Sequence, residues 1–325
     1  MKVLILRFSS IGDIVLTTPV ARLLKTQLNG EVHYAVKAAY RSIVASNPYV
    51  HKVWALDEPL PRFIGKLRKE KFDLVIDLHH NLRTLMVKSG LGVKSFSFDK
   101  LNIQKWLMVR FKIDKLPAVH IVQRCLKAAE SLGIEDDGKG LDFFIDKKDE
   151  LSMNYFPRAF QQGFIVFAIG GTHFTKKLPL EKMTDLCGEI NYPIVLTGGK
   201  EDWETGERLV KCASNRNIFN CCGRLSLGQS AGAAKMARAV ISHDTGMMHI
   251  AAAFQKEIFS IWGNTIPAFG MYPYRTVYHV IENNNLSCRP CSKIGFSKCP
   301  KGHFKCMNEL DMQALAKKIN LMVNG

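Results

Sequence analysis

The sequence predicts an α/β protein made of two Rossmann-like domains that face a central cleft. Short apolar runs alternate with helical stretches in both halves of the chain, and this alternation is typical of parallel sheets with crossover helices. Several of the apolar runs end in small or polar residues, which line the ligand-binding edge of such sheets. The chain has 325 residues, a length that suits two domains with a core each.

The N-terminal half accounts for the first of these domains. A helix is expected to begin at Ile14, and another to cover Ile121–Leu132. The polar stretch Asp146–Gln162 indicates a connection, so we expect one domain over residues 1–155 and a second over residues 156–325. Four short apolar runs predict strands, at Val3–Leu6, Glu31–Val36, Val53–Leu56 and Asp73–Leu78.

A second series of strands and helices fills the C-terminal half. The order of its elements predicts a second parallel sheet of the same kind. Strands are expected at Gly163–Ile169, Pro193–Thr197, Ala239–Ser242 and Glu257–Trp262. Helices are expected at Leu180–Glu189, Met247–Phe254 and Leu310–Val323.

Charge and hydropathy narrow the classes of function. The 45 basic and 29 acidic residues give a net charge of +16, which favours a phosphorylated substrate, an acidic membrane surface or nucleic acid as partner. A generally basic, solvated surface is the alternative. No DNA-recognition helix or aromatic RNA-binding signature stands in the sequence, so we expect no nucleic-acid partner. The sequence shows neither a membrane span nor a signal peptide, and we expect a cytoplasmic chain.

The first candidate site lies where the first predicted strand ends. Val3–Leu6 leads into Ser10, Gly12 and Asp13, and such a strand-to-helix turn offers backbone N–H groups and polar side chains to a ligand. Asp13 also has a plainer explanation, since a carboxylate near a helix N-terminus is stabilised by the helix dipole. The GxGxxG and GxxxxGK[ST] motifs are both missing, which disfavours a dinucleotide enzyme and a P-loop protein.

The second candidate site is the segment Ser242–His249, SHDTGMMH. Asp244 and Thr245 stand at the predicted end of a strand, and Gly246 lets the backbone approach a ligand closely. The helix that follows offers N–H groups suited to a phosphate. As alternatives, Asp244 or Thr245 could be a simple N-cap, and His249 could be a packed core histidine.

The third candidate site is the segment Gly170–Pro179, GGTHFTKKLP. Thr172 supplies a hydroxyl group after the strand, and Lys176 and Lys177 supply point charges suited to a diphosphate. The alternative is a lysine pair on a solvated loop.

The nine cysteines fall into two groups. A C-x2-C-x7-C-x6-C spacing with His303 nearby could hold a structural zinc ion; reduced cysteines without a metal are the alternative, and disulfides are not expected in the cytosol. The members of this group are Cys288, Cys291, Cys299 and Cys306. The others are expected to be buried as small apolar residues, namely Cys125, Cys187, Cys212, Cys221 and Cys222.

The chain resembles glycosyltransferase family 9, the lipopolysaccharide heptosyltransferases and their relatives. The motifs that carry the resemblance are RFSSIGDIVLTTP near the N-terminus and SHDTGMMHIAAAFQKEIFSIWGNTIP in the second half, and DLVIDLHHNLRT and HIVQRCLKAAESLGI also fit in order. The resemblance implies a GT-B fold, with the donor nucleotide sugar held mainly by the C-terminal domain and the acceptor mainly by the N-terminal one. It also implies transfer with inversion at the sugar.

The resemblance further implies roles for single residues. Asp13 matches the general base that the family is thought to use, and Asp244 matches the acid that holds donor-sugar hydroxyls. Lys176 best matches the phosphate-binding lysine, but Leu178 replaces an expected aromatic residue, so Lys177 stays an alternative. The remaining donor-side matches are Thr172, Thr245, Gly246, His249 and, for the ribose, Glu201 in competition with Asp202 and Glu204. The acceptor-side matches are Ser10, Gly12, Arg83 and Arg124.

The implied partners follow from the same resemblance. The donor is expected to be ADP-heptose-like, and the acceptor an anionic glycolipid of the lipopolysaccharide core or a related glycan, reached by peripheral contact with the cytoplasmic face of the inner membrane. No cofactor is expected in catalysis, since Lys176 and the helix at Gly246 supply positive charge and no DxD motif ends a strand. Two alternatives stay open: a nucleotide-sugar epimerase or hydrolase on the same fold, and a non-catalytic glycolipid-binding protein.

Overall fold

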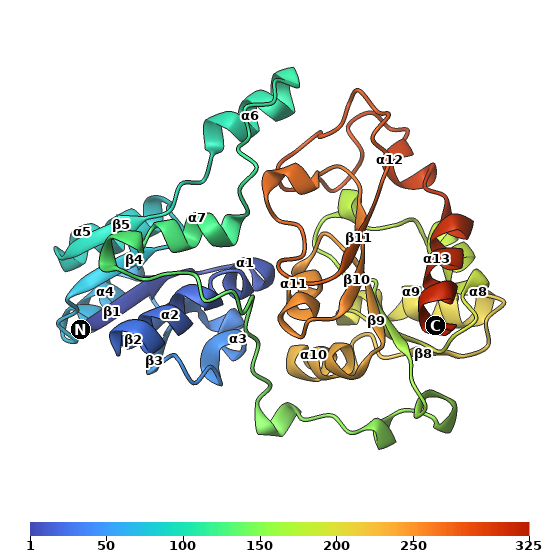
Figure 1. The fold of residues 1–325 in the computed structure, drawn as a ribbon, viewed down its shortest axis with the longest axis horizontal. Coiled ribbons are helices and arrows are strands. Elements are labelled where there is room, and N and C mark those ends of the chain that lie inside the picture. Colours follow the sequence, from blue (N-terminus) through green and yellow to red (C-terminus); the bar gives the residue numbers. More distant parts are fainter. Residues whose placement is uncertain (325) are drawn as a thin grey trace. The chain divides into compact units, whose positions relative to one another are not determined.

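The computed structural model describes residues 1–324, and the chain folds into two compact units (Figure 1). Unit 1 comprises Met1–Leu101 and Val119–Asp146. Unit 2 comprises Asn102–Ala118 and the described chain from Lys147 onward. Each unit contains one parallel sheet with helices, as the sequence predicts. The segment Asn102–Ala118 therefore belongs to unit 2, although the chain directly before and after it belongs to unit 1.

A five-stranded parallel sheet forms the centre of unit 1, in the order β3-β2-β1-β4-β5. β1 lies in the middle, where Val3 is paired with Val32 on one side and Leu74 on the other. The residues Val3–Leu6 are fully buried, as expected for a parallel strand that helices cover on both faces. The strands are β1 Lys2–Leu6, β2 Glu31–Lys37, β3 Lys52–Leu56, β4 Leu74–Asp77 and β5 Lys94–Ser97.

Local capping explains where the helices of unit 1 begin and end. The side chain of Asn81 accepts a hydrogen bond from the Thr84 N–H at 3.0 Å before α5, and Gly92 ends that helix with a left-handed backbone. Phe63 of α4 and Val87 of α5 pack on the buried side chains of the sheet. The helices are α1 Ile11–Val15, α2 Thr18–Leu28, α3 Ser42–Ala45, α4 Leu60–Arg68, α5 Leu82–Leu91 and α7 Ile121–Lys127, with short 3₁₀ turns η1 Ala38–Tyr40 and η2 Glu130–Leu132.

A six-stranded parallel sheet forms the centre of unit 2, in the order β11-β10-β9-β6-β7-β8. β6 lies between β7 and β9, where Val166 is paired with Val195 and Val240. All residues of these three strands are buried, so their ends define the edge at which a ligand can be bound. The strands are β6 Ile165–Ala168, β7 Ile194–Thr197, β8 Ile218–Asn220, β9 Ala239–His243, β10 Glu257–Trp262 and β11 Tyr278–Glu282.

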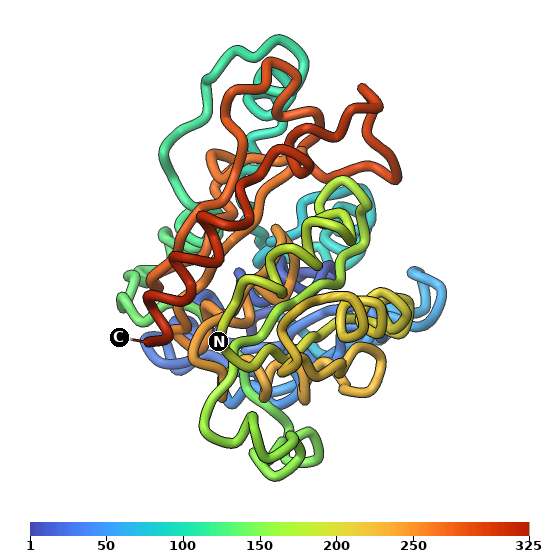
Figure 2. The backbone as a smooth tube through the Cα atoms, turned by 90° about the vertical axis from the view of Figure 1, so that its right-hand side faces the viewer, coloured from blue at the N-terminus to red at the C-terminus, as the bar shows by residue number. Residues whose placement is uncertain are grey.

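Helices cover the sheet of unit 2, and the C-terminal helix α13 lies beside α8 (Figure 1, Figure 2). Asn320 of α13 donates to the Glu189 carbonyl at 2.8 Å and accepts from the Asn191 N–H at 2.9 Å. The helices are α6 Asn102–Phe111, α8 Leu180–Glu189, α9 Trp203–Cys212, α10 Leu227–Met236, α11 Gly246–Ala253, α12 Lys305–Asn308 and α13 Met312–Asn324. The 3₁₀ turns are η3 Lys147–Asp149, η4 Met153–Tyr155, η5 Arg158–Phe160, η6 Phe174–Lys176, η7 Lys200–Asp202 and η8 Pro267–Phe269.

Two expected helix boundaries are wrong. The first helix begins at Ile11 rather than Ile14, because Ser10 adopts the extended conformation of an N-cap. The helix expected over Ile121–Leu132 ends at Lys127 and passes through a turn into η2. Within the described chain, no helix combines the length and the apolarity that crossing a membrane requires.

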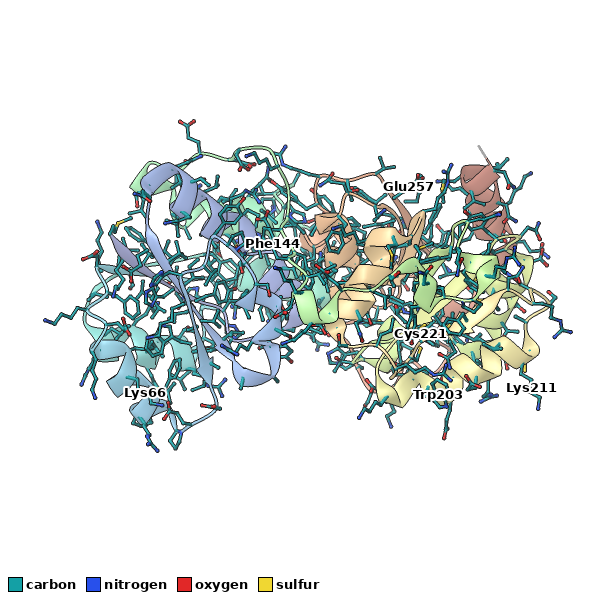
Figure 3. All side chains as sticks on the ribbon, turned by 90° about the horizontal axis from the view of Figure 1, so that it is seen from below. Lys66, Phe144, Trp203, Lys211, Cys221 and Glu257 are labelled. Atoms are coloured by element: carbon teal, nitrogen blue, oxygen red, sulfur yellow. The ribbon has the colours of Figure 1, made fainter. Side chains whose placement is uncertain are left out.

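One expectation about the cysteines is also wrong. Cys212 is exposed at the end of α9, near Lys211 (Figure 3). Cys221, which Figure 3 also labels, lies at the end of β8 and is buried. The other three cysteines outside the C-terminal group are buried as well, as predicted, namely Cys125, Cys187 and Cys222.

Candidate active site

The first strand of unit 1 leads directly into the short helix that carries Asp13. β1 is buried from Val3 to Leu6, and the chain leaves the sheet at the carboxyl end of this strand, the edge at which open α/β sheets bind ligands. The Ser10 N–H and hydroxyl both donate to Oδ2 of Asp13, at 3.2 and 2.7 Å. These two hydrogen bonds turn the carboxylate back toward the start of α1, as in a capping box. Asp13 is therefore held at the sheet edge with 22% of its side chain exposed.

A buried arginine holds the other oxygen of this carboxylate. Nη2 of Arg7 lies 2.5 Å from Oδ1 of Asp13. The guanidinium also donates to the carbonyls of Ser9, at 3.0 Å, and Leu78. Arg7 is only 7% exposed, so the carboxylate is the counter-charge that its burial requires. Arg7 was missed in the sequence, where the available signal was a basic residue directly after the apolar run Val3–Leu6.

These contacts decide the protonation states at the edge of the sheet. Burial acts to raise the pKa of Asp13, but the charge of Arg7 and the hydrogen bonds from Ser10 outweigh it and hold the pKa at about 2. Burial, together with the charges of Arg7 and Lys100, lowers the pKa of His79 to about 4. At neutral pH this edge therefore presents a carboxylate anion beside a neutral imidazole.

The residues expected on the acceptor side differ in exposure. Gly12 is a buried residue of α1, one position before Asp13. Arg83 is exposed on α5, with its guanidinium 6.0 Å from the centre of the Phe8 ring. Arg124 on α7 is buried and donates to the Asp99 carbonyl at 3.1 Å. Among these residues Arg83 offers an accessible cation, whereas Arg124 has a structural contact.

In unit 2, an ion pair ties together two loops at the carboxyl edge of the sheet. Nζ of Lys176 lies 2.6 Å from Oδ2 of Asp244 and donates to the Asp244 carbonyl at 3.1 Å. The Thr265 hydroxyl donates to the same Oδ2 at 2.8 Å. The two charged side chains are 17% and 8% exposed. Because an ammonium has three N–H groups, one of those on Lys176 remains for a ligand.

The neighbouring lysine makes a separate ion pair. Nζ of Lys177 lies 3.2 Å from Oδ1 of Asp202, whose Oδ2 accepts from the Gly199 N–H at 3.0 Å. Asp202 is 3% exposed, while Glu201 and Glu204 are exposed. The two lysines therefore hold different acids, and Asp202 is committed to structural contacts. Of the three acids considered for the ribose, Glu201 is an exposed acid that lies beside Gly199 in the turn after β7.

Two glycines let three strand ends come together at this edge. A Cβ on Gly170 would lie 2.7 Å from Oδ2 of Asp202 and 3.2 Å from Cα of Gly198. A Cβ on Gly171 would lie 3.1 Å from Cγ2 of Thr245. The ends of β6, β7 and β9 thus approach one another too closely for side chains at these positions.

The helix that follows Asp244 begins at the same edge. Gly246 is the first residue of α11, and Thr245 is its N-cap with an extended backbone. The first N–H groups of a helix have no partner within it and carry partial positive charge. His249 is 2% exposed, one turn into the helix, and Thr172 is exposed on the loop after β6. The start of α11 and the Lys176 ammonium together make an electropositive edge.

Two further residues of unit 2 were missed in the sequence because nothing local marks them. Thr265 lies in the NTIP part of the second motif and holds Asp244. Arg289, 8% exposed, donates to the carbonyls of Gly263 at 2.5 Å and Thr265 at 2.8 Å. Arg289 therefore fixes the loop that carries the Thr265 hydroxyl.

The C-terminal cysteines gather in one region, but loosely. Sγ of Cys288 lies 3.9 Å from Nε2 of His303, and the Cys291 thiol donates to the Cys288 carbonyl at 3.0 Å. Burial and the neighbouring Cys288 and Cys299 raise the pKa of Cys291 to about 11, and burial raises that of Cys306 to about 12, with the other three cysteines adding to it. A closed tetrahedral zinc site would hold its sulfurs about 4 Å from one another, whereas in the described chain no three of these residues have their ligand atoms within 4.8 Å of one another.

Three potential metal ligands of unit 1 lie closer together than the cysteines do. They are Glu31, His33 and His51, and their ligand atoms lie within 4.8 Å of one another. The Trp54 indole N–H donates to Nδ1 of His33 at 2.9 Å, so the neutral ring carries its proton on Nε2 and donates to Glu31 at 2.9 Å. Lys2 lies 3.2 Å from the same carboxylate. Both ring nitrogens of His33 are therefore engaged in hydrogen bonds, which leaves this residue no lone pair for a metal ion.

Known proteins are similar to this chain in sequence and in fold. Residues 61–300 match the family described as glycosyltransferase family 9 (heptosyltransferase). The chain is 26% identical over 320 residues to lipopolysaccharide heptosyltransferase 1 of Pseudomonas aeruginosa, a match that covers 90% of this chain and 86% of that protein.

Two solved structures from E. coli have a similar fold. One is the ADP-heptose lipopolysaccharide heptosyltransferase II, with a TM-score of 0.72, 17% identity, and coverage of 100% of this chain and 99% of that chain. The other is the heptosyltransferase WaaC with ADP, with a TM-score of 0.69, 20% identity, and coverage of 99% of this chain and 100% of that chain.

The Arg7–Asp13 pair predicts a specific dependence of stability on pH. Because the pKa of Asp13 is lowered from 3.8 to about 2, its ionised form contributes stability that is complete above pH 3.8 and is lost as the pH falls through about 2. The destabilisation caused by Asp13→Asn should therefore shrink by about 2 kcal/mol between neutral and strongly acidic pH.

Urea unfolding of the wild type and the variant over a pH series measures this difference. Asp57→Asn, at an exposed acid of the same unit, is the matched control and should show no comparable change. A difference in the free energy of unfolding between wild type and Asp13→Asn that stays constant with pH would contradict the Arg7–Asp13 pairing.

Proposed function

The chain belongs to glycosyltransferase family 9 and has its GT-B fold, and we propose that it transfers a heptose-type sugar from a nucleoside-diphosphate donor to a lipopolysaccharide-core or related glycan acceptor. The family match over residues 61–300 identifies a glycosyltransferase. The observation that carries the finer proposal is the Lys176–Asp244–Thr265 arrangement at the start of α11. It offers fixed positive charge and a fixed hydrogen-bond acceptor side by side, as a sugar diphosphate requires.

On the donor side, unit 2 holds the nucleotide sugar. The remaining N–H of Lys176 and the first N–H groups of α11, at Gly246, stabilise the negative charge that grows on the leaving diphosphate. Asp244 accepts hydrogen bonds from sugar hydroxyls through Oδ1, since Oδ2 already has two partners. Glu201 binds the ribose hydroxyls from the turn after β7. ADP is the nucleotide proposed, because a structural relative is described with ADP.

On the acceptor side, Asp13 of unit 1 receives the proton of the attacking hydroxyl. The acceptor oxygen forms a bond to the anomeric carbon, and the bond from that carbon to the diphosphate oxygen breaks, with inversion. The electron pair of the broken bond leaves with the nucleoside diphosphate, and the acceptor proton passes to an Asp13 oxygen.

The low pKa of Asp13 determines when this proton moves. A carboxylate with a pKa of about 2 is a weak base toward a neutral alcohol. Once the new C–O bond has begun to form, however, the hydroxyl becomes strongly acidic and a weak base suffices. Asp13 thus acts by orienting the hydroxyl first and accepting its proton late, while Ser10 and Arg7 keep the carboxylate in place.

The acceptor is an anionic glycolipid, reached from the cytoplasmic face of the inner membrane. The net charge of +16 favours such a partner. Arg83 supplies an exposed cation on the helix that follows β4, suited to a phosphate on the acceptor core.

Asp13→Asn tests the role of the carboxylate. Because the amide cannot accept the proton, kcat/KM should fall by about 10²–10⁴-fold, while the dissociation constant for ADP stays unchanged. Initial rates with a donor and a lipid-free core acceptor, and ADP titration by calorimetry, measure the two quantities. Asp57→Asn is the matched control and should keep full activity. Donor breakdown at the same rate without acceptor would instead favour a hydrolase or epimerase.

Lys176→Met tests the donor side. Loss of a charged hydrogen bond to the diphosphate should weaken ADP binding by about tenfold to a hundredfold. Thermal shift with ADP, UDP, GDP and CDP reports it, because a ligand that binds the folded state raises the melting temperature; ADP should give the largest shift in the wild type. Lys211→Met, at an exposed lysine on α9, should bind ADP normally. An equal loss in both variants would overturn the assignment.

A metal ion is proposed for the structure of the C-terminal segment but not for sugar transfer. Transfer uses no metal, because Lys176 and α11 supply the positive charge, so full activity is expected in excess EDTA. A structural zinc ion is proposed for the cysteine group, where Cys288, Cys291, Cys299 and Cys306 would supply thiolates. Metal analysis of the purified protein should then find one equivalent of zinc. Activity lost to EDTA and restored by magnesium would refute metal-independent transfer, and a metal-free, fully folded protein would refute the zinc site.

A further inference from the structure

One helix of unit 2 displays large apolar side chains without burying any residue. α6 spans Asn102–Phe111 and has no buried residue. Ile103 is 71% exposed, Trp106 56%, Phe111 54% and, in the loop that follows, Ile113 45%. Apolar side chains this large rarely gather on a solvent-exposed surface unless they contact a partner. We call the exposed face of residues 102–118 the α6 surface.

The α6 surface is also strongly basic. Lys105, Arg110, Lys112 and Lys115 lie among its apolar side chains, and Asp114 is the one acid in the stretch. Alternation of tryptophan, phenylalanine and isoleucine with lysine and arginine is typical of segments that lie in the interface of an anionic bilayer. There the rings enter the headgroup region while the cations meet lipid phosphates.

Contacts with the rest of unit 2 fix this surface in place. Nζ of Lys112 donates to the carbonyls of Pro290 at 2.6 Å and Cys288 at 3.3 Å. Nζ of Lys293 lies 3.4 Å from the side-chain oxygen of Asn102. The apolar side chains are therefore displayed by a segment that is anchored at both ends.

The segment that anchors α6 continues the same pattern. Ile294 is 54% exposed and Phe296 38%. Residues 287–308 contain no acid. The exposed cations of this segment are Lys293, Lys298, Lys301 and Lys305. Two stretches that are far apart in the sequence thus supply one basic, apolar region of unit 2.

We propose that the α6 surface docks unit 2 on an anionic lipid bilayer. Charge complementarity favours this occupant over a second copy of the chain, because two copies at +16 each would repel. The exposed rings and aliphatic side chains favour a bilayer over nucleic acid, since phosphate contacts alone would not need them. The proposal deepens the proposed function, whose acceptor is a glycolipid, but lipid binding itself requires neither donor nor acceptor.

Co-sedimentation of the full chain with vesicles tests the docking. Binding is expected to vesicles of phosphatidylcholine with phosphatidylglycerol and to be much weaker with phosphatidylcholine alone. Trp106→Glu should reduce the partition coefficient by about tenfold or more, and Lys115→Gln by about fivefold. Leu321→Glu is the matched control, because Leu321 is 68% exposed on α13 and lies outside the α6 surface. Equal binding of Trp106→Glu and the wild type would overturn the proposal.

Tryptophan fluorescence gives a second readout that does not depend on sedimentation. Trp106 should move to a less polar environment on the anionic vesicles, so the wild type should show a blue shift that Trp106→Phe lacks. Trp203→Phe, which changes a partly buried tryptophan of α9, should keep the shift. A shift that survives in Trp106→Phe would count against docking through α6.

Other occupants would be recognised in the same experiments. Self-association of the wild type without lipid, abolished by Trp106→Glu, would replace the bilayer with a second copy. Binding to an oligonucleotide that depends on Trp106 would replace it with nucleic acid. Turnover of a lipid-free core acceptor by Trp106→Glu should equal that of the wild type. Vesicle binding with no turnover in any variant would overturn the proposed function and leave the docking intact.

Discussion

A partly buried ion pair at the carboxyl edge of a parallel sheet is the interaction on which the candidate site residues of each unit depend. In unit 1 the pair is Arg7–Asp13, and in unit 2 it is Lys176–Asp244. Helices cover both faces of these sheets, so charged groups can be accommodated only where the strands end. There each charge must be paired, since an unpaired buried ion would be strongly destabilising. The fold therefore fixes one carboxylate at the sheet edge of each unit.

The partners of the two carboxylates give them different properties. Arg7 and Ser10 together hold Asp13 ionised and oriented, at the cost of basicity. Lys176 leaves part of its hydrogen-bonding capacity for a ligand, because its ammonium has three donors and Asp244 accepts two of them. In the proposed transfer, the first carboxylate receives a proton late, and the second belongs to a preorganised electropositive edge.

The sequence predicted both sheets because their central strands are continuous apolar runs, which have few alternative conformations. It also placed Asp13 and Asp244 at strand ends, where the turn residues mark them. It could not predict Arg7, Thr265 or Asp202 as partners, because those contacts join residues that no local pattern relates. β5, β8 and β11 were missed because these edge strands are short or partly exposed and carry mixed side chains. α6 was missed for a related reason, since a helix that buries nothing lacks the usual apolar stripe.

The segment from Cys288 to Cys306, which carries the four C-terminal cysteines, has contacts both with the interior of unit 2 and with the α6 surface. On its inner side, Arg289 holds the loop of Thr265, and the backbone of Phe296 pairs with Thr175, the residue before Lys176. On its outer side, the same segment accepts the Lys112 hydrogen bonds that anchor α6. The same stretch of backbone therefore supports the loops around Lys176 and Thr265 and holds the helix that carries the α6 surface. Because that stretch is tied down from inside, the surface it supports is ordered before it meets a bilayer, and docking therefore costs less conformational entropy.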